Sequence, residues 1–171
     1  MLTGHVAPTI LQTDLAILGG GLLIAFIITV VVNLVIAALV IGGLAPFVRK
    51  AKARIDENAL LPLIAGIIVL FGGSFLVGVL VITVVGLIIA VPLAIIIVAM
   101  SIAGHGVMIV LVGSLLTGQD VDGPLTKPVI IGAIGVSVLM FIPAIGTIIV
   151  LVLALVSIGS VALELRSRYY A

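Results

Sequence analysis

The stretch VITVVGLIIAVPLAIII, residues 81–97, decides how this chain folds. It carries no charge, yet it contains Gly86 and Pro92, two residues that weaken the interior of a helix. It lies at the centre of a longer apolar run, residues 60–116. As one helix that run would be about 85 Å long, whereas a bilayer crossing needs about 30 Å. The run therefore predicts two helices joined by a turn near Gly86 and Pro92.

The composition places the whole chain in a membrane. Hydrophobic residues make up 64% of the 171 residues and charged residues 8%, and the mean hydropathy is +1.67. Soluble globular domains carry about 25% charged residues, so that class is excluded. The net charge of +1, without a long basic tract, argues against a nucleic-acid partner. The lack of cysteine excludes disulfides and thiol chemistry.

A second broken run follows the first. Residues 128–165 would measure about 57 Å as one helix, and FIPAIG, residues 141–146, lies near their centre. Proline breaks the hydrogen-bond ladder and glycine permits positive φ, so Pro143 and Gly146 predict a second turn.

Both runs open in the same way. Asn58 precedes Pro62 and Thr126 precedes Pro128, a capping residue followed by proline in the first turn. Each proline also begins a Pro-x-x-x-Gly sequence, which two copies of one unit or chance could equally produce.

We therefore predict an all-α integral membrane protein of about five apolar helices, one N-terminal span and two helical hairpins. The predicted segments are a tail and first span (1–46), a basic interfacial segment (47–58), a first hairpin (59–117), a polar loop (118–127), a second hairpin (128–165) and a C-terminal tail (166–171). The interfacial segment is either an amphipathic helix with Phe47, Ala51 and Ile55 on one face or a solvated loop. The turns are almost devoid of polar residues, so each hairpin either crosses fully or is re-entrant, surrounded by protein or lining a wet cavity.

The basic residues predict the orientation. With one span and two hairpins, all of them fall on the same side, as the positive-inside rule requires of the cytoplasmic face. They are Arg49, Lys50, Lys52, Arg54, Lys127, Arg166 and Arg168. We expect a multi-pass protein of the cell membrane, with its N-terminus outside and its C-terminus in the cytoplasm. The N-terminal residues lack a basic region ahead of the apolar stretch, so the first span is expected to be retained.

Small and polar residues recur every four positions in the first span. They are Gly21, Ala25, Thr29, Asn33 and Ala37. This spacing predicts a helix-packing face, within the chain or between copies, with Asn33 as its polar centre. The alternative is that glycine and alanine are simply common in membrane helices.

His105 is the ionisable residue inside the long apolar run, and Ser101 lies one turn before it. An intramembrane ionisable residue is a candidate functional residue. A proton relay or metal site would need partners, and the sequence supplies no acidic residue, cysteine or second histidine at that depth. We therefore interpret His105 as structural, and expect neither an enzyme nor a metal or other cofactor.

Three stretches together resemble a known family. They are LAPFVRKAKARIDENALLPLIAG, VITVVGLIIAVPLAI and FIPAIGTIIVLVLALVSIG. They resemble the polytopic membrane module at the C-terminus of bactofilin-like, polymer-forming cytoskeletal proteins of prokaryotes. The resemblance implies a membrane anchor or scaffold, without catalytic residues.

Three functions remain open from the sequence. The first is a structural membrane protein that self-associates or organises membrane or cytoskeletal partners in the bilayer. The second is a small channel or transporter whose broken helices present backbone groups to a solute. The third is a membrane protein of a virus or vesicle.

Overall fold

The computed structural model describes residues 6–119 and 123–169, with side chains from residue 19 onward, and no strand occurs in those ranges. The chain is an all-α protein, and the predicted fold class is confirmed. The elements in chain order are α1 (Val6–Leu39), the π-helical turn η1 (Val40–Leu44), α2 (Ala45–Glu57), α3 (Leu60–Ile67), the π-helical turn η2 (Ile68–Gly72), α4 (Gly73–Val81), α5 (Val84–Thr117), α6 (Thr126–Met140) and α7 (Ile145–Tyr169).

Four continuous helical segments of the described chain are long and apolar enough to cross a membrane. They are Gly19–Glu57, Leu60–Val81, Val84–Thr117 and Ile145–Tyr169. The fifth apolar helix, α6, has only 15 residues and would measure about 22 Å. These lengths are compatible with a multi-pass membrane protein in which α6 is short for a full crossing.

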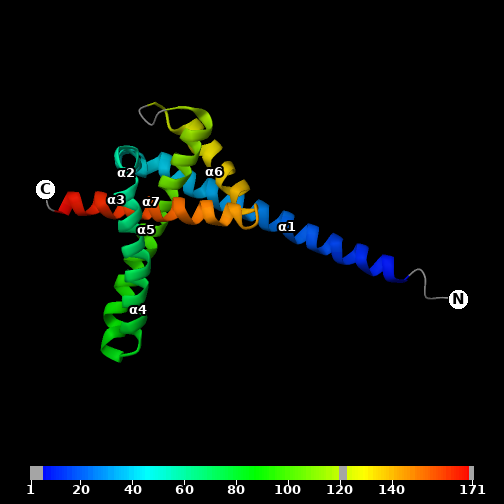
Figure 1. Ribbon diagram of the computed structural model, residues 1–171, viewed down its shortest axis with the longest axis horizontal. Helices are drawn as coiled ribbons and strands as arrows, with labels where there is room; N and C mark the ends of the chain where they lie inside the picture. Colours follow the sequence, from blue (N-terminus) through cyan, green and yellow to red (C-terminus); the bar gives the residue numbers. More distant parts are fainter. Residues whose placement is uncertain (1–5, 120–122, 170–171) are drawn as a thin grey trace.

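The two hairpins cross each other (Figure 1). The rod α3–η2–α4 returns through a turn into α5, and α6 returns through a second turn into α7. The most extensive contacts join the hairpins, because α3 packs on α7 and α5 packs on α6. Each hairpin thus lays its first helix against the second helix of the other.

The first turn differs from the sequence prediction. The chain reverses at Ile82 and Thr83, and Pro92 lies inside the continuous helix α5. Thr83 ends the preceding rod and caps α5, since its Oγ1 accepts a hydrogen bond of 2.9 Å from the Gly86 amide. Pro92 is therefore not a helix break, because the Thr83 cap sets the start of α5 two turns earlier and the helix continues through the proline.

The turn glycines also act differently from the prediction. Gly86 and Gly146 both lie in the first turns of helices without positive φ; in the second turn, Ala144 has a φ of 58°. A Cβ on Gly86 would collide with the Leu80 carbonyl, and one on Gly146 with the Leu139 carbonyl. These glycines permit close return of the chain onto the preceding helix, and positive φ is not needed.

Near the helix ends, the structure decides between two alternatives and corrects two expectations. Of the helix and the solvated loop considered for residues 47–58, the structure has the helix, α2, which packs on α5 and α7. The C-terminal tail continues α7 as far as Tyr169. Thr126 is the first residue of α6, whose preceding residue offers no side-chain cap. The loop residues 120–122 lie outside the described residues.

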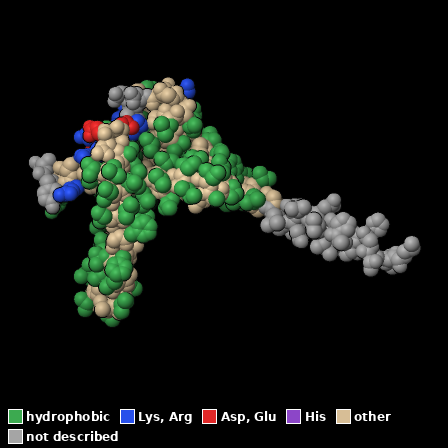
Figure 2. Space-filling model, in the orientation of Figure 1, with side chains coloured by type: hydrophobic (Ala, Val, Ile, Leu, Met, Phe, Trp, Pro, Cys, Tyr) green, Lys and Arg blue, Asp and Glu red, His purple; other side chains and the backbone are tan. Residues whose placement is uncertain are grey.

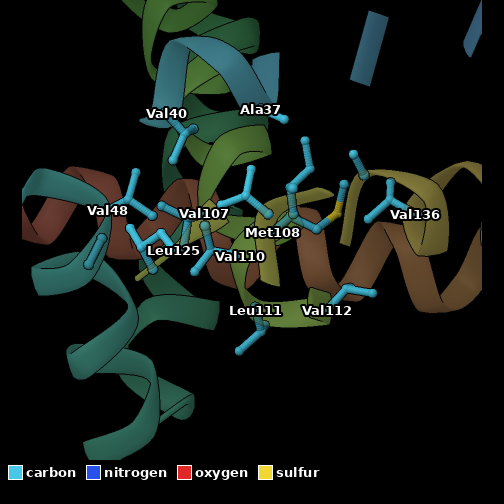
Figure 3. Close-up of a cluster of buried hydrophobic side chains, with 14 of the residues drawn as sticks. Ala37, Val40, Val48, Val107, Met108, Val110, Leu111, Val112, Leu125 and Val136 are labelled. Carbon is cyan, nitrogen blue, oxygen red and sulfur yellow. The ribbon is translucent and has the colours of Figure 1, made fainter. Parts of the chain in front are cut away.

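Apolar side chains from five helices meet where the hairpins cross (Figure 3). Val40 and Val48 contribute from the α1–α2 region, and the C-terminal third of α5 contributes a continuous buried run from Val107 to Val112. A run buried on every side needs partners all around it, which α1, α2, α6 and α7 supply. At this crossing, the apolar side chains are covered by other helices of the chain and do not need lipid to cover them.

Candidate functional site

A buried chain of polar groups links α1, α6 and α5. The Asn33 amide nitrogen donates to Ser137 Oγ at 2.8 Å, and Asn33 Oδ1 lies 2.6 Å from His105 Nε2. Asn33 and Ser137 are almost completely buried. The three side chains lie on three different helices, so they fix α1 at the crossing of the hairpins.

The hydrogen-bond pattern determines the direction of each bond. Ser137 donates its proton to the Ala133 carbonyl at 2.8 Å, so it must accept from the Asn33 amide. Asn33 Oδ1 then faces His105, whose Nε2 must carry a proton and donate it. A charged imidazole would be costly among these apolar segments. His105 is therefore a neutral ring with Nδ1 left as an acceptor.

A cavity of about 430 Å³ adjoins these groups between α1 and α5. Asn33 and His105 line it, together with Thr29 and Ser101, and Met140 of α6 contributes to the wall. Ser101 donates to the carbonyl of Ile97 in its own helix. Ser101 and His105 therefore share a cavity without a hydrogen bond between them.

The predicted packing face of α1 divides into two halves. Asn33 and Ala37 are buried against the rest of the chain and Thr29 is half-buried, whereas Gly21 and Ala25 are exposed. A Cβ on Gly21 would meet nothing within 4 Å. The face is thus occupied inside the chain only at its C-terminal half.

Glycines bring the backbones of the two hairpins into direct contact. A Cβ on Gly113 of α5 would collide with the Pro128 carbonyl, and one on Gly132 of α6 would collide with the Ile109 carbonyl. The same arrangement recurs between α3 and α7. There, Cβ atoms on Gly66 and Gly159 would collide with the carbonyls of Leu155 and Pro62 respectively. The Pro-x-x-x-Gly openings therefore occupy equivalent positions in two similar units.

Charged side chains gather at one end of the molecule (Figure 2). Glu164 is buried and accepts hydrogen bonds of 3.1 Å from both Arg54 and Arg168. Arg49 donates to the Gly123 carbonyl at 2.9 Å. The remaining predicted basic residues lie on α2, in the first turn of α6 and in the last turn of α7; they are Lys50, Lys52, Lys127 and Arg166.

Sequence reasoning missed the partners in these contacts. Ser137 is one of several serines in apolar sequence, and only the fold brings it to Asn33. Gly113 and Gly159 were also missed, although each follows a β-branched residue and precedes a serine, in VGS and IGS. Reading this short repeat together with the Pro-x-x-x-Gly openings would have paired the four glycines. Among the described residues, no group of three metal-binding side chains occurs.

A search of curated proteins and a search of solved structures each found no match. A family model described as "Domain of unknown function (DUF8173)" matches residues 1–169. Because this match spans nearly the whole chain, the protein belongs to the DUF8173 family.

Proposed function

We propose that this protein is a non-enzymatic structural element of the membrane that associates with further copies of itself. The observation that carries the proposal is the unused half of the small-residue face on α1. This helix extends beyond the other helices toward the N-terminus (Figure 1), and its exposed residues Gly21 and Ala25 continue the face that Asn33 and Ala37 bury. Small residues let helix backbones approach closely in lipid, where apolar area alone drives little association.

The glycine contacts between hairpins support a rigid role. Backbone packed on backbone leaves no side chain that can repack, so the crossed hairpins are suited to hold a fixed shape. A transporter, by contrast, needs parts that move against each other. The resemblance to the membrane module of bactofilin-like proteins points the same way, toward an anchor or scaffold with cytoskeletal or membrane partners.

The charged end supports an orientation. All seven basic residues lie on α2, at the start of α6 or in the last turn of α7. We place this end in the cytoplasm by the positive-inside rule, with the N-terminus outside the cell membrane. A cytoplasmic partner would then meet α2 and the end of α7.

The test is the mass of the protein in lipid nanodiscs. Gly21→Leu combined with Ala25→Leu is expected to convert a defined oligomer into smaller species, because the leucines hold the helices apart. Gly78→Leu on α4 is the matched control, since Gly78 is also exposed with open space around it, and it should leave the mass unchanged. A monomeric wild-type protein, or an oligomer that survives the double substitution, would contradict the proposal.

The alternative is a small channel or transporter. The observation that favours it is the cavity beside Asn33 and His105, because polar groups at membrane depth commonly mark a solute path. A path of this kind requires water to reach Ser101 from at least one side of the bilayer.

A further inference from the structure

The cavity between α1 and α5 has apolar walls and four polar side chains, those of Thr29, Asn33, Ser101 and His105. Its volume of about 430 Å³ falls within the range of about 300–1,000 Å³ that is usual for small-molecule sites. Ile28 and Val32 line it from α1, and Val98 and Ile102 from α5. These walls suit an apolar molecule that arrives through the bilayer.

The two hydroxyl groups that line the cavity already donate hydrogen bonds to backbone carbonyls. Thr29 donates to the Ala25 carbonyl at 2.8 Å, and Ser101 donates to the Ile97 carbonyl at 2.8 Å. Each hydroxyl oxygen keeps lone pairs and has no further proton to give. Both oxygens can therefore only accept hydrogen bonds from a molecule in the cavity.

His105 also offers the cavity a hydrogen-bond acceptor. Its Nε2 donates to Asn33, whose own amide donates to Ser137. A neutral histidine with a protonated Nε2 has an acceptor at Nδ1. The groups on the cavity wall thus combine three acceptors with no free donor among Thr29, Ser101 and His105.

We propose that this cavity binds an uncharged, apolar alcohol from the bilayer and accepts the hydrogen of its hydroxyl group. Thr29, Ser101 and His105 offer no donor to an anion or a ketone, and the Asn33 amide, which keeps one further N–H, is only 2% exposed. A cation would bring its charge into an apolar site that offers no carboxylate to pair with it. A hydroxyl carries the required donor at a small desolvation cost, and a hydrocarbon body fills the walls.

The experiment compares three photoreactive probes on the wild-type protein in lipid nanodiscs. The probes are dodecanol, its methyl ether and dodecane, each with the same diazirine on the chain, and mass spectrometry maps the labelled residues. The alcohol is expected to label the α1 and α5 walls about fivefold more than the ether, since one net hydrogen bond gives about that ratio. Equal labelling by alcohol, ether and alkane would overturn the proposal and leave an apolar crevice.

Conservative variants locate the hydrogen bond. Thr29→Val together with Ser101→Ala removes two of the three acceptors with little change of volume, and should reduce the preference for the alcohol over the ether, because only the His105 acceptor remains. Ser74→Ala, on the exposed surface of α4, is the control and should keep the preference. A preference for the alcohol that is undiminished in the double variant would contradict the assignment to this cavity. Labelling of α1 and α5 does not depend on oligomer mass, so the two proposals can fail separately.

Discussion

Asn33 positions α1 because both the nitrogen and the oxygen of its side-chain amide make hydrogen bonds to other helices. Its nitrogen donates to Ser137 and its oxygen accepts from His105. In apolar surroundings neither neighbour has water as a replacement partner, so the loss of Asn33 leaves polar groups unsatisfied. Hydrogen bonds between membrane helices nevertheless contribute only modestly, about 0.6 kcal/mol on average and up to about 1.7 kcal/mol. The contacts therefore orient α1 more than they hold the fold together.

A double-mutant cycle should detect this pair. We expect Asn33→Ala to lower the free energy of unfolding by about 1–2 kcal/mol, and the cycle with His105→Ala to give a coupling of about 0.6–1.7 kcal/mol. The measurement is reversible unfolding in mixed micelles of mild detergent and dodecyl sulfate. Thr29→Ala is the control, because its hydroxyl bonds only to its own helix. Fully additive effects of the Asn33 and His105 variants would show that their 2.6 Å contact contributes nothing.

At the scale of helices, two equivalent glycine contacts join the hairpins. Gly113 of α5 meets the backbone of α6 near Pro128, and Gly159 of α7 meets the backbone of α3 near Pro62. Backbone atoms cannot rotate away as a side chain can, so an added methyl group must push the two helices apart. Because the helices on each side belong to different hairpins, such a shift would spread through the whole crossing.

Alanine at these glycines should destabilise the protein strongly. We expect Gly113→Ala and Gly159→Ala each to cost about 3 kcal/mol, at the upper end of the usual overpacking range. The two losses should be similar, since the contacts are equivalent. Thermal unfolding in detergent measures both. Gly78→Ala should be neutral or slightly stabilising, as this glycine has open space around it. A Tm for either variant equal to that of the wild-type protein would refute the proposed close contact.

At the scale of the whole molecule, charge and apolar surface are separated. The charged residues of α2 and the end of α7 lie at one end (Figure 2), and the remaining surface is largely apolar. Arg54 and Arg168 converge on the buried carboxylate of Glu164, which links α2 to α7. In the proposed topology, this polar end lies at the cytoplasmic surface of the bilayer.

Single cysteines should report that orientation, because the natural chain has none. Lys50→Cys and Ser167→Cys are expected to react with a membrane-impermeant thiol reagent from the cytoplasmic side only. Ser101→Cys should react from neither side if the protein is a structural element, and Ser74→Cys, on α4, is the lipid-facing control. Labelling of Lys50→Cys from outside would reverse the proposed topology. Labelling of Ser101→Cys with Ser74→Cys unreactive would instead favour the channel.

The sequence by itself determined the all-α class, the number of apolar helices and the starts of α3 and α6. These depend on hydropathy, length and proline position, which act locally along the chain. The sequence also singled out Asn33 and His105, since a polar residue in an apolar run is conspicuous. It placed the first turn near Gly86 and Pro92, whereas the chain turns at Ile82 and Thr83, where Thr83 caps α5, and Pro92 lies within that helix.

Only the tertiary structure decided which helices face each other. It paired α3 with α7 and α5 with α6, joined Asn33 to Ser137 and left Gly21 and Ala25 uncovered. The physical reason is that lipid-facing and protein-facing surfaces are equally apolar in a membrane protein. Hydrophobic periodicity, which marks the buried face of a soluble helix, therefore carries little information here. Close contact between backbones and the pairing of a few polar groups select the arrangement instead.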